Sequence, residues 1–134
     1  MKIEYRDIKE FKADELKELF LSVGWSSGEY PEKLVVAMRN SAHVRSAWHD
    51  GSLVGLMNAL SDGAMTAYFH YLLIRPDYQK IGIGTKLVAD MLEHYREYPR
   101  KVLISYNEQI GFYEKCGFET SRNSTPVFVT SLTT

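Results

Sequence analysis

Leu72-Leu73-Ile74-Arg75-Pro76-Asp77-Tyr78-Gln79-Lys80-Ile81-Gly82-Ile83-Gly84-Thr85 joins an apolar strand to a glycine-spaced loop that opens into a helix. Glycines at 82 and 84 let the main chain approach a ligand closely, and the N–H groups of a first helical turn have no partner within the helix. Gln79 and Lys80 add a side-chain donor and a positive charge beside the same turn. This stretch therefore predicts a site for a phosphate or pyrophosphate group.

Two familiar phosphate loops do not fit this stretch. The dinucleotide fingerprint needs a third glycine at position 87, which is leucine here. The P-loop pattern Gly-x-x-x-x-Gly-Lys-Ser/Thr is absent. Because a bare Gly-x-Gly also suits an ordinary strand-to-helix connection, the function has to be read from a second segment as well.

That second segment runs from Asn107 to Phe118 and reads as a short helix after the apolar strand 101–106. Together the two segments resemble the GNAT superfamily of acetyl-CoA-dependent N-acetyltransferases. The loop is similar to the family's Arg/Gln-x-x-Gly-x-Gly/Ala signature, carried here by Gln79, Gly82 and Gly84. The second segment is similar to the family's Asn…Phe-Tyr-x-x-x-Gly-Phe pattern, carried by Asn107, Phe112, Tyr113, Gly117 and Phe118. The match is strongest over residues 67–118.

The resemblance implies an α/β (α+β) fold of the GNAT type. We expect a mixed, mostly antiparallel sheet of about six or seven strands, flanked by about four helices, with a splayed central strand pair that admits the cofactor. The apolar periodicity of the chain agrees with this arrangement. It predicts helices over 12–23, 31–39, 82–98 and 110–116, and strands over 2–8, 43–49, 53–60, 67–74, 101–106, 118–120 and 127–132.

Size and composition narrow the class of protein. At 134 residues with 45% hydrophobic content, the chain suits a single domain spanning 1–134. A net charge of −1 argues against nucleic acid as a partner, since binding to a phosphate backbone normally needs a basic face. The sequence has no apolar run that would span a membrane and no signal pattern, and it holds one cysteine. We therefore expect a cytoplasmic protein without a membrane partner.

The resemblance implies acetyl-CoA as co-substrate. Main-chain groups of Leu72, Leu73 and Ile74 would pair with the pantetheine arm, and a backbone N–H near Leu73 would face the thioester oxygen. Asn107 would bond the pantetheine, although it also suits an ordinary helix cap or turn. The loop that would hold the pyrophosphate consists of Gln79, Lys80, Ile81, Gly82, Ile83, Gly84 and Thr85.

Tyr113 occupies the family's tyrosine position, which implies that it donates a proton or a hydrogen bond to the leaving thiolate. A buried aromatic packed beside Phe112 is the alternative interpretation. Reference pKa values of about 10 for tyrosine and 8.5 for a thiol make full proton transfer uphill by roughly 2 kcal/mol. Tyr113 is therefore expected at least to hydrogen-bond the developing thiolate.

The general base is where the sequence departs from the commoner family pattern. Many members carry a carboxylate on the strand before the phosphate loop, but this strand reads Ala67-Tyr68-Phe69-His70-Tyr71-Leu72. His70 titrates in the useful pH range, and Tyr68 lies two residues away on the same face. His70 as a strand histidine without a chemical role stays open, as do Asp62 and Glu29 as partners for an ammonium group.

The acceptor side is expected around Trp25, Glu29, Tyr30 and Asp62, with glycines 24 and 28 making the loop mobile. A solvent loop with one aromatic docked on the core is the alternative. His43 and His49 are too few ligands for a zinc site, so no metal is expected.

We therefore expect acetyl transfer to a primary amine by direct attack in a ternary complex, with a small molecule as the preferred acceptor. Three alternatives remain: acetylation of protein N-termini or lysines, a catalytically weak acyl-CoA-binding sensor, and an interaction domain without a cofactor. The resemblance also makes a homodimer possible.

Overall fold

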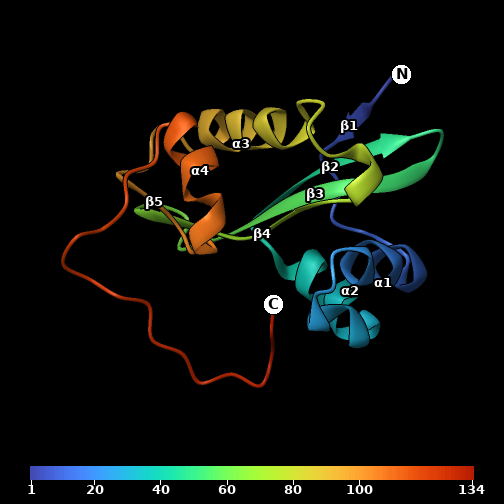
Figure 1. The fold of residues 1–134 in the computed structure, drawn as a ribbon, viewed down its shortest axis with the longest axis horizontal. Coiled ribbons are helices and arrows are strands. Elements are labelled where there is room, and N and C mark those ends of the chain that lie inside the picture. Colours follow the sequence, from blue (N-terminus) through green and yellow to red (C-terminus); the bar gives the residue numbers. More distant parts are fainter.

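The computed structural model describes residues 1–134, and a five-stranded sheet in the order β1-β2-β3-β4-β5 forms its centre (Figure 1). Neighbouring strands are antiparallel except for β4 and β5, which are parallel. The mixed, mostly antiparallel architecture is thus confirmed. The strands are β1 (Glu4–Arg6), β2 (His43–His49), β3 (Ser52–Ser61), β4 (Thr66–Ile74) and β5 (Arg100–Leu103).

Helices cover both faces of the sheet (Figure 1). Helices α1 (Ala13–Ser22) and α2 (Pro31–Asn40) pack on one face, and α3 (Ile83–His94) and α4 (Ile110–Lys115) pack on the other. Each face therefore has its own apolar core, centred on Phe20 and Leu56 under α1 and on Met57 and Met91 under α3. None of these helices combines the length and the apolar composition needed to cross a membrane. Short 3-10 turns occur at η1 (Ser26–Glu29), η2 (Pro76–Tyr78) and η3 (Asn107–Gln109).

A β-bulge interrupts β4 in the middle of the sheet. Ala59 pairs with Phe69 and Met57 pairs with Leu72, so β4 has one residue more than β3 between these two pairs. An extra residue shifts the alternation of side chains between the two faces. Phe69 accordingly packs under α3, whereas Tyr71, two residues on, packs under α1.

The strands β4 and β5 separate after a short paired segment. Their pairing runs from Thr66 with Arg100 to Phe69 with Leu103, where β5 ends, while β4 continues to Ile74. The unpaired half of β4 thus borders a gap in the sheet at the point where β4 leads into the phosphate loop. The splayed strand pair expected from the sequence is confirmed.

Two expected strands are absent, so the predicted count of six or seven strands was wrong. Phe118 is part of the turn that ends α4, because its N–H bonds to the Tyr113 oxygen and Gly117 takes a φ of 101°. Residues 127–132 form no strand despite their β-prone composition. A β-prone segment forms a strand only when it pairs with the edge of a neighbouring strand. The short strand β5 makes no hydrogen bond to this segment.

Three expected elements differ from the structure by two or more residues at a boundary. The strand expected over 2–8 is limited to Glu4–Arg6, the three residues that pair with β2. The helix after the loop at 79–85 ends at His94, four residues before the expected Tyr98. Residues 95–98 form turns and bends, and the rings of Tyr95 and Tyr98 are in contact there. The strand expected over 101–106 ends at Leu103, because the parallel partner β4 diverges there.

Candidate active site

The predicted phosphate loop, residues 79–85, presents a row of unpaired main-chain donors. Gly82 has a φ of 95° and precedes the first residue of α3. No N–H group of residues 80–85 donates a hydrogen bond within the protein; the first to do so is that of Lys86, which bonds to the Gly82 oxygen over 3.0 Å. The positive end of the helix dipole lies at the same place. Consecutive free N–H groups of this kind fit a pyrophosphate.

Side chains shape this loop without filling it. Gln79 Nε2 donates to the Ile74 oxygen over 2.9 Å, so this amide fixes the loop on the end of β4. Lys80 has a φ of 65° and makes no ion pair, which leaves its charge free beside the donors. A Cβ at Gly84 would lie 3.5 Å from the Phe112 ring, an ordinary contact, so Gly84 marks where α3 and α4 meet.

A cleft of about 900 Å³ lies between the separated ends of β4 and β5. Its walls come from segments far apart in the chain: the loop before α2, the second half of β4, the end of β5 with η3, the helix α4, and the C-terminal residues. Of the residues predicted to act here, the cleft brings together Trp25, Tyr68, His70, Leu72, Asn107 and Tyr113.

Tyr113 is held in the cleft by the end of α4. The N–H groups of Gly117 and Phe118 bond to the oxygens of Glu114 and Tyr113, a Schellman motif, and the rings of Tyr113 and Phe118 lie 5.9 Å apart. Tyrosine hydroxyls at 71, 78 and 106 have partners within the protein, but that of Tyr113 has none. Burial, and to a smaller extent Cys116, raises the pKa of Tyr113 to about 12. Tyr113 is therefore a protonated, unengaged donor at neutral pH.

His70 stands between two tyrosines on the wall of the cleft. Its ring stacks on Tyr71 at 4.0 Å and lies 5.6 Å from Tyr68, an arrangement that the bulge in β4 creates. The His70 side chain is exposed to the cleft, yet the surrounding rings desolvate it enough to lower its pKa. Burial raises the pKa of Tyr68. At pH 7 His70 is thus neutral and able to accept a proton.

A buried amide that no sequence motif indicated holds the bulge in place. Asn58 Oδ1 accepts the Tyr71 N–H over 2.8 Å, and Asn58 Nδ2 donates to Ser41 Oγ over 3.1 Å. Ser41 Oγ in turn donates to the Ala37 oxygen in α2. Asn58 is 1% exposed, and its polarity within the apolar run 53–60 was the signal that could have revealed it.

A buried pair of hydroxyl groups also borders the cleft. Ser27 Oγ and the Tyr71 hydroxyl are 3.0 Å apart, and both residues are buried. Trp25 packs against Tyr71 and Phe20 beside them. No motif pointed to Ser27 or Tyr71, because their proximity depends on the folding of the loop before α2 onto β4.

Several predicted residues lie outside the cleft. Glu29 and Tyr30 are exposed at the end of η1, and Leu73 and Ile74 turn their side chains toward the two cores. Asp62 Oδ1 accepts the N–H groups of Ala64, Met65 and Thr66, which lowers the pKa of this carboxyl. Asp62 therefore shapes the turn between β3 and β4, and the acceptor roles of Glu29, Tyr30 and Asp62 stay predictions.

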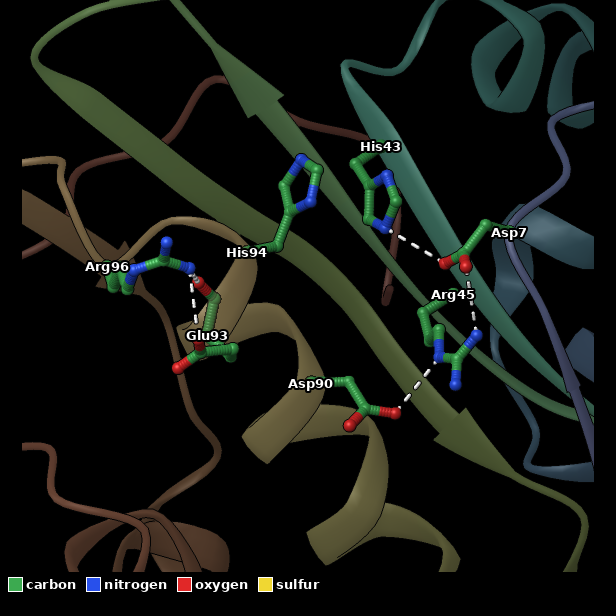
Figure 2. Close-up of a pocket in the computed structure, with 7 residues that line it drawn as sticks. All are labelled: Asp7, His43, Arg45, Asp90, Glu93, His94 and Arg96. Carbon is green, nitrogen blue, oxygen red and sulfur yellow. Dashed lines mark hydrogen bonds and ion pairs between the residues drawn. The ribbon is translucent and has the colours of Figure 1, made fainter.

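A separate, wholly polar pocket of about 400 Å³ lies between β2 and the end of α3 (Figure 2). Asp7 bridges His43 and Arg45 at 3.1 and 3.0 Å, and Arg45 reaches Asp90 at 3.0 Å. The rings of His43 and His94 stack at 4.0 Å. No three His, Cys, Asp or Glu side chains in the protein are arranged to hold a metal ion. The carboxylates and cations here neutralise one another and join β2 to α3.

Comparisons with known proteins agree with this geometry. The acetyltransferase (GNAT) family profile matches residues 8–118. A protein of Pyropia yezoensis named "Uncharacterized N-acetyltransferase ycf52" is 30% identical over 128 residues, which cover 87% of this chain and 73% of the relative. An acetyltransferase of the GNAT family from Streptococcus pneumoniae superposes with a TM-score of 0.83 at 25% identity, covering 97% of this chain and 99% of that one. This chain therefore belongs to the GNAT family of N-acetyltransferases.

Proposed function

We propose that this protein transfers the acetyl group of acetyl-CoA directly to a primary amine of a small molecule. The observation that carries the proposal is the position of Tyr113, whose free hydroxyl lies in a cleft that opens where β4 and β5 separate. The unpaired N–H groups of residues 80–85 would hold the pyrophosphate, and the lone cysteine, Cys116, is free, which suits the cytoplasm.

The protein has a candidate residue for the attacking amine and another for the leaving thiolate. The thioester of acetyl-CoA supplies the activated acetyl group, and the amine has to lose a proton before it attacks. His70 is neutral at pH 7 because burial lowers its pKa, so it can accept that proton directly or through water. Its neighbours Tyr68 and Tyr71 confine the imidazole on the cleft wall.

Tyr113 supports the departing thiolate mainly through a hydrogen bond. With a pKa of about 12 against about 8.5 for a thiol, complete proton transfer from tyrosine would be uphill by about 5 kcal/mol. A donated hydrogen bond stabilises the developing negative charge without that cost. The high pKa keeps the donor protonated across the physiological pH range.

The test is release of free CoA thiol from acetyl-CoA across a panel of arylalkylamines, polyamines, amino sugars, amino acids and short peptides. We expect release that depends on one class of small amine. Its kcat/KM should decline as the pH falls below the ordinary histidine value of about 6.5, since protonated His70 cannot act as a base.

Two results would contradict the proposal. Acetylation of peptides alone would move the acceptor class to proteins. Tight CoA binding without turnover of any amine would instead favour an acyl-CoA sensor, an alternative favoured by the scarcity of acidic groups in the cleft, where Glu108 is the single carboxylate side chain.

A further inference from the structure

We propose that residues 126–134 form a strap across the acceptor end of the cleft, and that its release controls how large an acceptor can enter. Six residues of this strap line the same cleft as Tyr68 and His70: Phe128, Val129, Thr130, Leu132, Thr133 and Thr134. In Figure 1 the C-terminal segment leaves α4, swings away from the sheet and returns beside α2.

The strap is fastened at its final two residues. The Thr134 main-chain oxygen accepts the Ser27 N–H at 2.7 Å, the Ser27 hydroxyl at 2.8 Å and the Ser26 hydroxyl at 3.2 Å. The Thr133 N–H donates to Ser26 Oγ at 2.8 Å, and the Tyr106 hydroxyl donates to the Thr133 oxygen at 3.3 Å. Tyr106 also bonds to the Thr134 hydroxyl. We call this set of contacts, made by Ser26, Ser27 and Tyr106, the latch.

The C-terminal segment before the latch makes few contacts with the rest of the protein. From residue 119 to residue 129 no hydrogen bond joins the segment to the rest of the protein; the contact of Ser121 with Ser124 is internal. Val127, Phe128 and Val129 are 90%, 65% and 107% exposed, so packing adds little. A segment with few buried contacts opens at a small fraction of the global unfolding free energy. The strap can therefore open when the latch breaks, without unfolding the sheet.

The latch also connects the strap to the part of the cleft wall that carries His70. Ser27 Oγ, which donates to Thr134, is the atom 3.0 Å from the Tyr71 hydroxyl, and the Tyr71 ring stacks on His70. A closed strap therefore confines the space beside His70 to acceptors small enough to fit under it. This consequence for acceptor size rests on the proposed acetyl transfer, whereas the opening of the strap does not.

Opening can be measured without catalysis through the two tryptophans. Trp25 lines the cleft directly before Ser26, while Trp48 is 4% exposed in the core, so acrylamide quenching of fluorescence reports mainly on Trp25. We expect Ser26→Ala combined with Tyr106→Phe to raise the quenching constant by roughly twofold, because both substitutions remove donors from the latch. Ser121→Ala, which removes a serine hydroxyl from the same segment outside the latch, should leave it unchanged.

The second readout is acceptor size. In the double variant, kcat/KM for a bulky amine relative to a small one should rise by about fivefold or more over the parent. The two substitutions remove four latch contacts, and about fivefold is the equivalent of one net hydrogen bond. If the quenching constant and the ratio of kcat/KM for bulky and small amines are both unchanged, while the parent turns over amines, the strap proposal is contradicted. The proposed acetyl transfer is then unaffected. Increased quenching without turnover of any amine would support the strap and reject the proposed function.

Discussion

The two ends of the candidate site are built by different means, since none of residues 79–85 lines the cleft itself. The phosphate-loop end consists of contiguous residues, 79–85, whose donors are main-chain N–H groups at the start of one helix. The acceptor end combines side chains from η1, β4, η3 and the C-terminal segment, which meet only in the folded chain. Because the first end is local in sequence and the second is not, one is set by backbone conformation and the other by tertiary packing.

The difference predicts separate consequences for substitutions at each end. Changes in the phosphate loop should weaken acetyl-CoA binding and leave the chemical step intact. Changes near β4 and α4 should affect turnover or folding, because Tyr113 and His70 are positioned by a helix cap and by a buried amide.

Tyr113→Phe should have the largest effect. It removes the free hydroxyl from the cleft while keeping the ring contacts with Phe112 and Phe118. We expect kcat to fall by about 100-fold, the lower range for loss of a general acid or an oxyanion donor, with little change in the KM for acetyl-CoA.

Tyr98→Phe is the matched control, since it also deletes a tyrosine hydroxyl but lies outside the cleft. Steady-state kinetics of both variants at saturating amine make the comparison. Equal kcat values for Tyr113→Phe and the parent would show that the Tyr113 hydroxyl has no role in the chemical step.

Asn58→Leu should destabilise the fold by about 2 kcal/mol. The substitution leaves the Tyr71 N–H and the Ser41 hydroxyl with one partner fewer in the core, and each lost buried bond costs about 1–3 kcal/mol. Urea denaturation followed by circular dichroism measures the change. Asn123→Leu, at an exposed position, should stay within about 0.5 kcal/mol of the parent. Equal stability of the two variants would contradict a role for Asn58 in holding the bulge.

Gly82→Ala should raise the KM for acetyl-CoA by about tenfold and leave kcat nearly unchanged. The φ of 95° at Gly82 lies in a region that costs an alanine about 1–2 kcal/mol, although space for a methyl group is available. Gly111→Ala, at a glycine without positive φ, is the matched control. A loss of kcat without a change in KM would show that the two ends of the candidate site do not act separately.

His43→Gln should have the smallest effect, since His43 lies outside the cleft in the pocket of Figure 2. Burial, followed by the charge of His94, lowers the pKa of His43 in the folded state, against the opposing pull of Asp7. The unfolded chain therefore binds more protons near and below pH 6.5, so this group makes stability fall as the pH decreases through that range.

Replacing His43 should flatten the dependence of the unfolding free energy on pH between about 7 and 5, by less than about 1.4 kcal/mol per pH unit. Urea titrations at several pH values measure this slope. A steeper slope in the variant would mean that the ion pair with Asp7 outweighs burial.

The sequence predicted the parts of the molecule that are local. Gly82 and the flanking Gln79 indicated the strand-to-helix loop, where Gly82 takes a positive φ of 95° directly before α3. The end of β5 did not follow from the sequence, because it depends on where β4 leaves its parallel partner.

The acceptor end could not be derived in the same way. The roles of Ser27, Asn58 and Tyr71 depend on hydrogen bonds between residues 13 to 44 positions apart in the chain. The β-prone run 127–132 indicated a strand, but its outcome depended on a partner edge that periodicity does not reveal. Local patterns thus indicated the conformation of the loop before α3, whereas tertiary packing determined the geometry of the cleft where an acceptor is proposed to bind.

The most direct test of the account is a calorimetric titration of acetyl-CoA into the parent, Gly82→Ala and Tyr113→Phe proteins. We predict a dissociation constant about tenfold weaker for Gly82→Ala and within about twofold of the parent for Tyr113→Phe, as main-chain donors hold the ligand and the tyrosine serves the reaction. Equal weakening in both variants, or no binding to the parent, would contradict the division of the candidate site into a binding end and a reacting end.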